Sequence, residues 1–321
     1  MDEMRVNLAA LKLIIIDEMS LVSADNLYRI HQRLCDIFQN KKIFGGISIM
    51  LVGDLLQLPP VCATAIFKIP THPSHQVLFH EESLWHSAFE VVNLVHNHRQ
   101  GEGSKWADVL NKFRDGTFSE EDVKILEERI IKDVNIPELE DACHVFYRNE
   151  DVADRNKRKL NLLQNVDLFE IKAVMKMHVS CRPCIKVHGT VGDTNMMEYL
   201  KIKVGARVMM IVNVDTSDKL VNGTLGTIID IVKHENSEDV KCVIISYDNS
   251  EAGRKQREKH PHLAAKYKSS NGTPLFKHNV NYEMPSKSKG KSHAAMGTVT
   301  QFPIRLAWAN TAHKLQVFCK N

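Results

Sequence analysis

Residues 11–20 have the sequence LKLIIIDEMS, and residues 45–61 have the sequence GGISIMLVGDLLQLPPV. The apolar run Leu13 to Ile16 ends in Asp17 and Glu18, and the run Ile47 to Val52 ends in Gly53-Asp54. Short apolar runs that end in turn signals are typical of parallel strands buried on both faces. The two stretches therefore predict an α/β fold with helices packed over a parallel sheet.

The acids that follow these strands predict a nucleotide site, because ligands of such sheets bind beyond the carboxyl ends of the strands. Asp17 suits a magnesium ion, which prefers one or two carboxylates together with phosphate oxygens. Glu18 suits the base that accepts a proton from the water attacking a terminal phosphate. Gln57 is placed to sense that phosphate through its amide. The alternative is an ordinary sheet whose strand-end acids are solvated.

Further elements are expected on both sides of residue 100. Ser23 to Phe38 predicts a helix with Ser23 as its N-cap. Val91 to Val95 predicts a short strand that leads to Arg99, whose guanidinium can bind two phosphate oxygens at once or form a surface salt bridge. Two helices are expected over 106–113 and 119–131.

The second half predicts another strand-to-helix unit and then a β-rich region. Cys143 to Phe146 is expected to be a buried strand, followed by a charged helix that extends to Leu163. Asn149 suits either a contact to a nucleic-acid phosphate or an N-cap role. Residues 204–232 and 240–247 predict antiparallel strands, and 304–309 predict a return to the sheet.

Composition limits the class of protein. The 321 residues are enough for about two domains, and the hydrophobic content of 43% is enough for packed cores. No apolar stretch approaches the length of a membrane span and no signal-peptide pattern opens the chain, so no membrane partner is expected. The seven cysteines are scattered, which suggests reduced thiols. An H-x2-C-x2-C-x3-H pattern favours a β-rich hairpin over zinc, although zinc stays open; it comprises His178, Cys181, Cys184 and His188.

The net charge of +3 conceals a basic segment. Residues 253–293 contain ten Lys or Arg and two acids, whereas the rest of the chain has 32 basic and 37 acidic residues. A basic block on a nearly neutral body indicates a polyanion partner. The alternative is a solvated, poorly ordered loop.

The two opening stretches and several later ones resemble, in sequence and in order, the motifs of superfamily 1 DNA helicases of the petite-integration-frequency (Pif) type. IIIDEMS and GDLLQLPPV are similar to motifs II and III of that family. The further matches span nearly the whole chain and are NHRQ (97–100), FYRNEDVADRN (146–156), VGARVMMIVNVD (204–215), LVNGTLGTI (220–228) and FPIRLAWANTAHKLQ (302–316).

The resemblance implies two RecA-like P-loop NTPase domains with a small inserted β-barrel. Residues 1–95 correspond to the C-terminal part of the first domain and 96–200 to the start of the second. Residues 201–300 correspond to a barrel-like subdomain with a basic loop, and 301–321 return to the second domain.

The resemblance also implies the chemistry. ATP and Mg²⁺ are the expected cofactors, with Asp17, Gln57, Arg99 and Gln316 near the nucleotide. Thr311, His313 and Lys314 are expected to contact DNA backbone, together with Asn149. The implied function is ATP-dependent 5′ to 3′ unwinding in recombination, repair and telomere maintenance. The expected partners are single-stranded DNA and duplex junctions. The protein is expected to act as a monomer in the nucleus, the mitochondrion or both.

Two family features are missing from these 321 residues. A P-loop, G-x-x-x-x-G-K-[ST], should precede the Asp-Glu strand, and a later arginine motif should follow Gln316. Four lost contacts to charged phosphate groups are worth on the order of 6 kcal/mol, or about 10⁴-fold in affinity. We therefore expect a fragment of an active ATP hydrolase that is itself inactive. The alternative is a single-stranded-DNA-binding remnant without ATPase activity.

Overall fold

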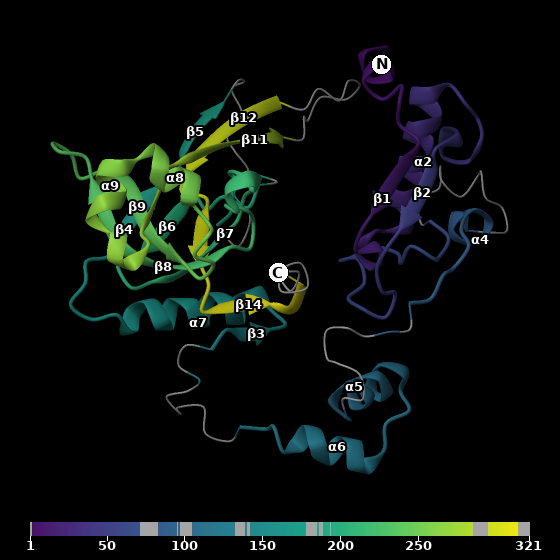
Figure 1. Cartoon of the computed structure of the whole chain (residues 1–321), viewed down its shortest axis with the longest axis horizontal. Coiled ribbons are helices and arrows are strands. Elements are labelled where there is room, and N and C mark those ends of the chain that lie inside the picture. Colours follow the sequence, from purple (N-terminus) through teal and green to yellow (C-terminus); the bar gives the residue numbers. More distant parts are fainter. Residues whose placement is uncertain are drawn as a thin grey trace. The chain divides into compact units, whose positions relative to one another are not determined.

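The computed structural model describes residues 2–70, 83–94, 96, 105–131, 139, 142–177, 185, 189–192, 194–284 and 295–313 (Figure 1). The chain divides into two compact units, Met1–Lys132 and Asp133–Asn321. Each unit is considered by itself below.

The first unit is built on the parallel strands β1 (Leu13–Ile16) and β2 (Ser48–Leu51). The long helix α2 (Ala24–Phe38) lies beside them in Figure 1. Its Leu27 and Leu34 share a core with Ile14 of β1 and Ile49 of β2. The hydroxyl of Ser23 accepts a hydrogen bond from the backbone N–H of Asn26 at 3.1 Å, which confirms the predicted N-cap.

The prediction that both faces of these strands are buried is wrong for the residues that the structure describes. Leu13, Ile15 and Met50 are 47%, 61% and 51% exposed to solvent. Side chains alternate between the faces of a strand, so α2 covers one face of this two-stranded sheet and leaves the other open.

Short helices complete the first unit. Their bounds are α1 Asp2–Asn7, η1 Met19–Leu21, η2 Ile43–Gly46, α4 Leu84–Ala88, α5 Lys105–Asp115 and α6 Glu120–Glu127. The last two confirm the predicted helix pair, although α6 ends before Ile131. The predicted strand over 91–95 is absent from residues 91–94, and Val92 and Leu94 keep 85% and 90% of their exposure. A strand needs a neighbour that supplies hydrogen bonds, and no pairing holds this stretch.

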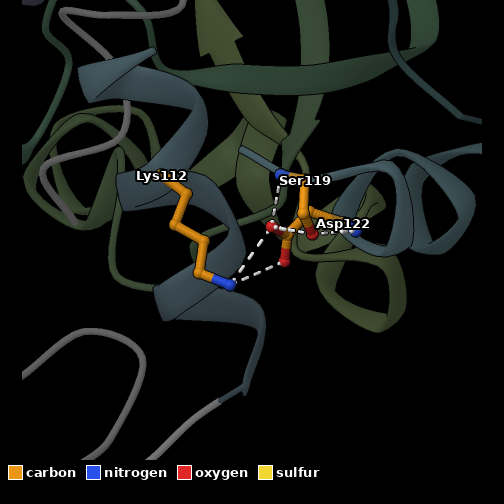
Figure 2. Close-up of polar contacts among 3 residues, drawn as sticks. All are labelled: Lys112, Ser119 and Asp122. Carbon is orange, nitrogen blue, oxygen red and sulfur yellow. Dashed lines mark hydrogen bonds and ion pairs between the residues drawn. The ribbon is translucent and has the colours of Figure 1, made fainter. Parts of the chain in front are cut away.

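Asp122 ties α5 to α6 (Figure 2). Its carboxylate accepts hydrogen bonds from the backbone N–H of Ser119 at 2.8 Å and from the Lys112 ammonium at 2.9 Å. The Ser119 hydroxyl also accepts a hydrogen bond from the Asp122 N–H, which completes a capping box. These bonds hold the pKa of Asp122 down at about 2, with the Ser119 backbone bond as the largest cause.

The second unit contains another parallel strand pair. Strand β3 (His144–Phe146) pairs with β14 (Ala309–Thr311), and α7 (Asn149–Leu162) lies beside both (Figure 1). The chain thus returns to this sheet at Ala309, later than the predicted 304–309 segment. Residues 304–306 form β13 (Ile304–Leu306), which pairs antiparallel with a different sheet.

That different sheet has the strand order β10-β9-β8-β7-β13 and forms most of the main core of the unit. The strands not yet given are β7 Arg207–Met210, β8 Leu225–Lys233, β9 Val240–Tyr247 and β10 Thr273–Leu275. The predicted antiparallel hairpins are confirmed. The predicted barrel is not confirmed. Within the described chain this sheet is open, with the three-residue strands β10 and β13 at its edges. Closure would require these edges to pair, and such short strands offer few hydrogen bonds for it.

Two smaller antiparallel sheets flank it. One pairs β4 (Phe169–Lys172) with β6 (Tyr199–Ile202), and the other has the order β11-β12-β5. The bounds of the latter are β5 Val174–Met177, β11 His278–Met284 and β12 Ala295–Gln301.

The basic segment is folded rather than a loop over residues 253–284. It forms α8 (Arg254–Lys259), α9 (Pro261–Lys266) and η5 (Lys268–Ser270) before β10 and β11. The carboxylate of the buried Asp218, at the end of η4 (Thr216–Asp218), receives the N–H groups of Lys255 and Gln256 at 2.7 and 3.0 Å. Residues 285–293 of the segment lie outside the described residues.

Candidate nucleotide and nucleic-acid site

The carboxyl ends of β1 and β2 bring the predicted nucleotide-site residues of the first unit to one edge. We call Asp17, Glu18, Asp54 and Gln57 the β1–β2 edge. Ile16 pairs with Leu51, so the two strands end level. Beyond them the backbones stay bonded, from Val52 N–H to Ile16 O at 2.8 Å and from Met19 N–H to Val52 O at 3.0 Å. The edge is therefore held by backbone hydrogen bonds.

Glu18 has a left-handed backbone, with φ 54° and ψ 49°. Its N–H donates to the Asp17 carboxylate at 2.8 Å, so the two acids form one tight turn. Non-glycine residues visit this region infrequently, and the strain is typical of functional turns.

Gly53 lets the two strand-end turns approach each other. Its φ is +147°, and a Cβ atom there would lie 2.8 Å from the backbone nitrogen of Met19. A side chain at this position would push the turn after β2 away from the turn that carries Glu18. The sequence signal for this contact is a glycine between an apolar strand and an acid.

Asp54 makes several of the hydrogen bonds that hold this edge, and no site role was predicted for it from the sequence. Arg114 of α5 binds it with both terminal nitrogens, each at 2.6 Å from a carboxylate oxygen. Asp54 also accepts the Leu56 N–H at 3.0 Å and the Gln57 side-chain amide at 3.4 Å. Gln57 therefore stands in a turn that Asp54 begins. The partner Arg114 is 60 residues away in sequence, so no local pattern points to it.

The edge fits a magnesium ion by its chemistry. That ion is usually held by one or two carboxylates, phosphate oxygens and water rather than by a protein cage. An ionised carboxylate can accept several contacts. Asp17 can therefore bind a magnesium ion while it accepts the hydrogen bond from the Glu18 N–H. Within the described parts of the chain, no cluster of three His, Cys, Asp or Glu residues suits a metal ion.

Several predicted site residues lie outside the described residues. They are Arg99, Lys314 and Gln316, and the same holds for all four members of the candidate zinc pattern, His178, Cys181, Cys184 and His188.

Three of the predicted DNA contacts, Asn149, Thr311 and His313, lie at or just after the carboxyl ends of β3 and β14. We call Tyr147, Asn149, Thr311 and His313 the β3–β14 edge. Thr311 pairs with Phe146, directly before Tyr147. Thr311 is buried, with 7% exposure, whereas Asn149 is exposed. Arg148 is the N-cap of α7, so the N-cap alternative for Asn149 is wrong: Asn149 is the first helical residue.

Asn156 holds this edge together and was missed by sequence reasoning. Its amide oxygen accepts the Ala309 N–H at 2.9 Å, and its amide nitrogen donates to Ala309 O at 3.1 Å. Asn156 is 6% exposed, so these bonds are shielded from water. A polar residue in a charged helix resembles a surface residue in sequence, which is why its burial gives no local signal.

A groove of about 900 Å³ adjoins α7 and is lined by residues of α7, β6 and β13. Asn149 and Arg305 both line it. Burial lowers the pKa of the Arg305 guanidinium to about 10, and Arg305 donates to the Asn310 side-chain oxygen at 2.6 Å. The groove thus combines an exposed amide with a partly buried cation.

No helix in the described chain has the length and apolar character that crossing a bilayer requires.

Parallel strand pairs with helices beside them and polar side chains at their carboxyl ends define an α/β protein similar to RecA-like helicases. A family model described as "PIF1-like helicase" matches residues 2–124, and one described as "DNA helicase Pif1, 2B domain" matches residues 195–231. Over these two stretches the chain is similar to Pif1-like helicases.

Curated relatives agree with these matches. The ATP-dependent DNA helicase Pif1 of Campylobacter jejuni is 28% identical over 96% of this chain and 62% of its own length. The ATP-dependent DNA helicase PIF1 of Candida albicans is 29% identical over 70% of this chain and 24% of its own length. The chain thus spans less than two thirds of the length of these relatives.

Solved structures agree as well. Bacteroides Pif1 bound to ssDNA is 25% identical, with a TM-score of 0.61 over 97% of this chain and 63% of that one. The Candida albicans Pif1 helicase has a TM-score of 0.68 at 22% identity, over 98% of this chain and 65% of that one, which supports the fold.

Proposed function

We propose that this chain supplies ATP-hydrolysing and DNA-binding parts of a Pif1-type DNA helicase that unwinds DNA in the 5′ to 3′ direction. The β1–β2 edge carries this proposal, because it combines two adjacent carboxylates with a strand-end turn in a family of ATP-dependent helicases. Bacteroides Pif1 has been solved with ADP-AlF3 and ssDNA, at 25% identity and a TM-score of 0.60 over 97% of this chain and 63% of that one. That complex supports a nucleotide and a single strand as ligands.

In this proposal the β1–β2 edge binds ATP and positions the attacking water. Asp17 would hold Mg²⁺, which would neutralise phosphate charge when bound. Glu18 accepts the proton of the water. Gln57, oriented by Asp54, reads the terminal phosphate. Arg99 and Gln316 complete the nucleotide contacts.

The second unit supplies the DNA contacts. Asn149, Thr311, His313 and Lys314 bind backbone phosphates, with the folded basic segment as a further electrostatic contact. Phosphate contacts of this kind position a strand without reading its sequence. Single-stranded DNA and duplex junctions are the proposed partners, and the proposed state is a monomer.

The domain assignment belongs to the same proposal. Residues 1–95 lie in a first RecA-like domain, 96–200 and 301–321 in a second, and 201–300 in an inserted subdomain with the character of a barrel. The proposed biological roles are recombination, repair and telomere maintenance in the nucleus, the mitochondrion or both. Fungal relatives named PIF1 and RRM3 support this setting.

The test uses the chain joined to a segment that supplies the expected P-loop, and it measures binding of a fluorescent ATP analogue and of labelled single-stranded DNA, with and without Mg²⁺. We expect Mg²⁺-dependent ATP binding that Asp17→Asn weakens. We expect Glu18→Gln to keep ATP binding while abolishing any DNA-stimulated hydrolysis. Asp36→Asn, at an exposed position of α2, is the control and should match the wild type.

Two outcomes would contradict parts of the proposal. DNA binding without Mg²⁺-dependent ATP binding would support a single-stranded-DNA-binding module that lacks ATPase activity. Unchanged hydrolysis in the Glu18→Gln variant would remove Glu18 as the base.

A further inference from the structure

Tyr147 is an aromatic side chain held almost entirely in solvent. Tyr147 is 89% exposed to solvent, whereas Phe67, Phe118 and Tyr199 are 36%, 47% and 41% exposed. Single exposed apolar residues are common on protein surfaces and need no explanation of their own. The position of Tyr147 at the β3–β14 edge is what distinguishes it.

Tyr147 lies in a short turn whose two neighbouring elements are both held by contacts to β14. Tyr147 and Arg148 are the two residues between β3 and α7, and both neighbouring elements are fixed. β3 is paired with β14, while Asn156 of α7 binds the backbone of Ala309 in β14. A tyrosine side chain has only two χ angles, so binding through it costs little conformational entropy.

The charges around Tyr147 select the part of a nucleic acid that can reach it. Arg148, the exposed residue next to Tyr147, carries a positive charge, and Glu150 and Asp151 follow in the first turn of α7. The two carboxylates disfavour a phosphate directly over this turn. An uncharged base, in contrast, can stack on the tyrosine face while its phosphate lies toward Arg148 and Asn149.

We propose that Tyr147 is a stacking platform for one base of single-stranded DNA. This inference rests on the proposed function, because it assigns a base contact to an edge that otherwise binds backbone. Aromatic stacking accepts any base, since each base has a π-face. The contact would therefore add affinity without adding sequence preference.

The experiment measures fluorescence anisotropy of a labelled oligo-dT with wild-type protein and three variants. Tyr147→Phe keeps a stacking ring and should bind as the wild type does. Tyr147→Ala and Tyr147→Leu remove it and should weaken binding by roughly 5- to 150-fold, which corresponds to about 1–3 kcal/mol per stacked base. The thermal unfolding of all variants should stay near that of the wild type, because the side chain is exposed.

Two controls isolate the stacked base. Phe118→Ala removes a half-exposed ring from the first unit, where it stacks on Phe113 with ring centroids 4.4 Å apart, and should leave DNA affinity unchanged. An oligonucleotide of abasic sites should bind the wild type and Tyr147→Ala equally, because no base remains to stack.

The outcomes separate the two proposals. A wild-type protein that binds no DNA would overturn the proposed function, and this inference with it. A wild-type protein that binds DNA, with Tyr147→Ala and Tyr147→Leu binding equally well, would overturn the stacking role alone. The same applies if the loss in these variants persists on abasic DNA.

Discussion

At the residue scale, Gly53 controls the geometry of the β1–β2 edge. Replacing Gly53 with alanine adds a Cβ atom 2.8 Å from the Met19 nitrogen, at a φ of +147° that L residues rarely adopt. We expect Gly53→Ala to lower the free energy of unfolding by about 2–4 kcal/mol, from backbone strain and overpacking together. Urea denaturation measures this loss.

Gly116 supplies the matched control for this substitution. It also has a positive φ, +71°, but a Cβ atom there meets nothing within 4 Å. Gly116→Ala should therefore cost only about 1–2 kcal/mol of left-handed strain. Equal losses in the two variants would show that the contact with Met19 does not matter.

Asp122 gives the first unit a defined acid sensitivity. Its pKa lies at about 2 in the folded protein and starts from 3.8, so the carboxylate is held charged by Ser119 and Lys112. A depressed pKa contributes stability that is complete above about pH 4 and is lost as the pH falls toward about 2. We expect Asp122→Asn to remove this part of the pH dependence of unfolding.

A ¹³C NMR titration of the Asp122 carboxylate measures its pKa directly. Glu121→Gln, at an exposed neighbouring position of α6, should leave the pH dependence near that of the wild type. A titration midpoint for Asp122 near 3.8 would contradict the bonding drawn in Figure 2.

At the element scale, α8 depends on a carboxylate from another part of the chain. Asp218 is 3% exposed and accepts the N–H groups of Lys255 and Gln256, which otherwise lack helical partners. We expect Asp218→Ala to destabilise the second unit by about 2–4 kcal/mol, since two charge-assisted hydrogen bonds are lost. Thermal unfolding and hydrogen exchange over residues 254–259 measure this effect.

Glu258→Gln is the control within the same helix. Glu258 and Arg254 form an exposed ion pair, with side-chain exposures of 64% and 68%. Such pairs contribute up to about 1 kcal/mol, so this variant should unfold near the wild type. Rapid exchange of α8 amides in the wild-type protein would contradict the capping role of Asp218.

The elements that sequence predicts well are those with strong local signals. The apolar runs that become β1 and β2 and the capped stripe that becomes α2 each carry their own pattern. Residues 91–94 carry a similar apolar pattern but form no strand, because pairing depends on a neighbour rather than on the run itself. Closure of the predicted barrel is likewise not shown among the described residues, because it depends on contacts between sheet edges that no single stretch encodes.

The candidate site shows the same division. Asp17, Glu18 and Gln57 were predicted as site residues because they follow strands directly, and the structure brings them to one edge. The Asp54–Arg114 pair and the Asn156 contacts were missed, since their partners are 60 and 153 residues away in sequence. Residue type at one position carries no information about such a partner.

At the scale of the whole molecule, the basic segment 253–293 gives the chain an uneven charge distribution. Part of its described charge is used internally: Arg257 donates to Ala252 O, Thr273 Oγ1 and Ser250 O. Lys259 and Lys268 are exposed. If both contact single-stranded DNA, replacing them with glutamine should reduce the slope of log affinity against log salt by about 0.7 each.

DNA affinities measured at several salt concentrations test this expectation. Lys41→Gln, an exposed lysine of the first unit, should leave the slope unchanged. Arg257→Gln should instead lower thermal stability, because its hydrogen bonds are internal. A slope that stays constant in the double lysine variant would mean that this face does not hold DNA.

The pairing of β3 with β14 also has a consequence for synthesis on the ribosome. Asn156 emerges 153 residues before Ala309, the residue that its amide binds. At about 5–20 residues per second, translation separates the two by roughly 8–30 s. During that interval β3 and α7 lack the strand that pairs with β3, so a nascent chain must keep this surface from aggregating until Ala309 has been made.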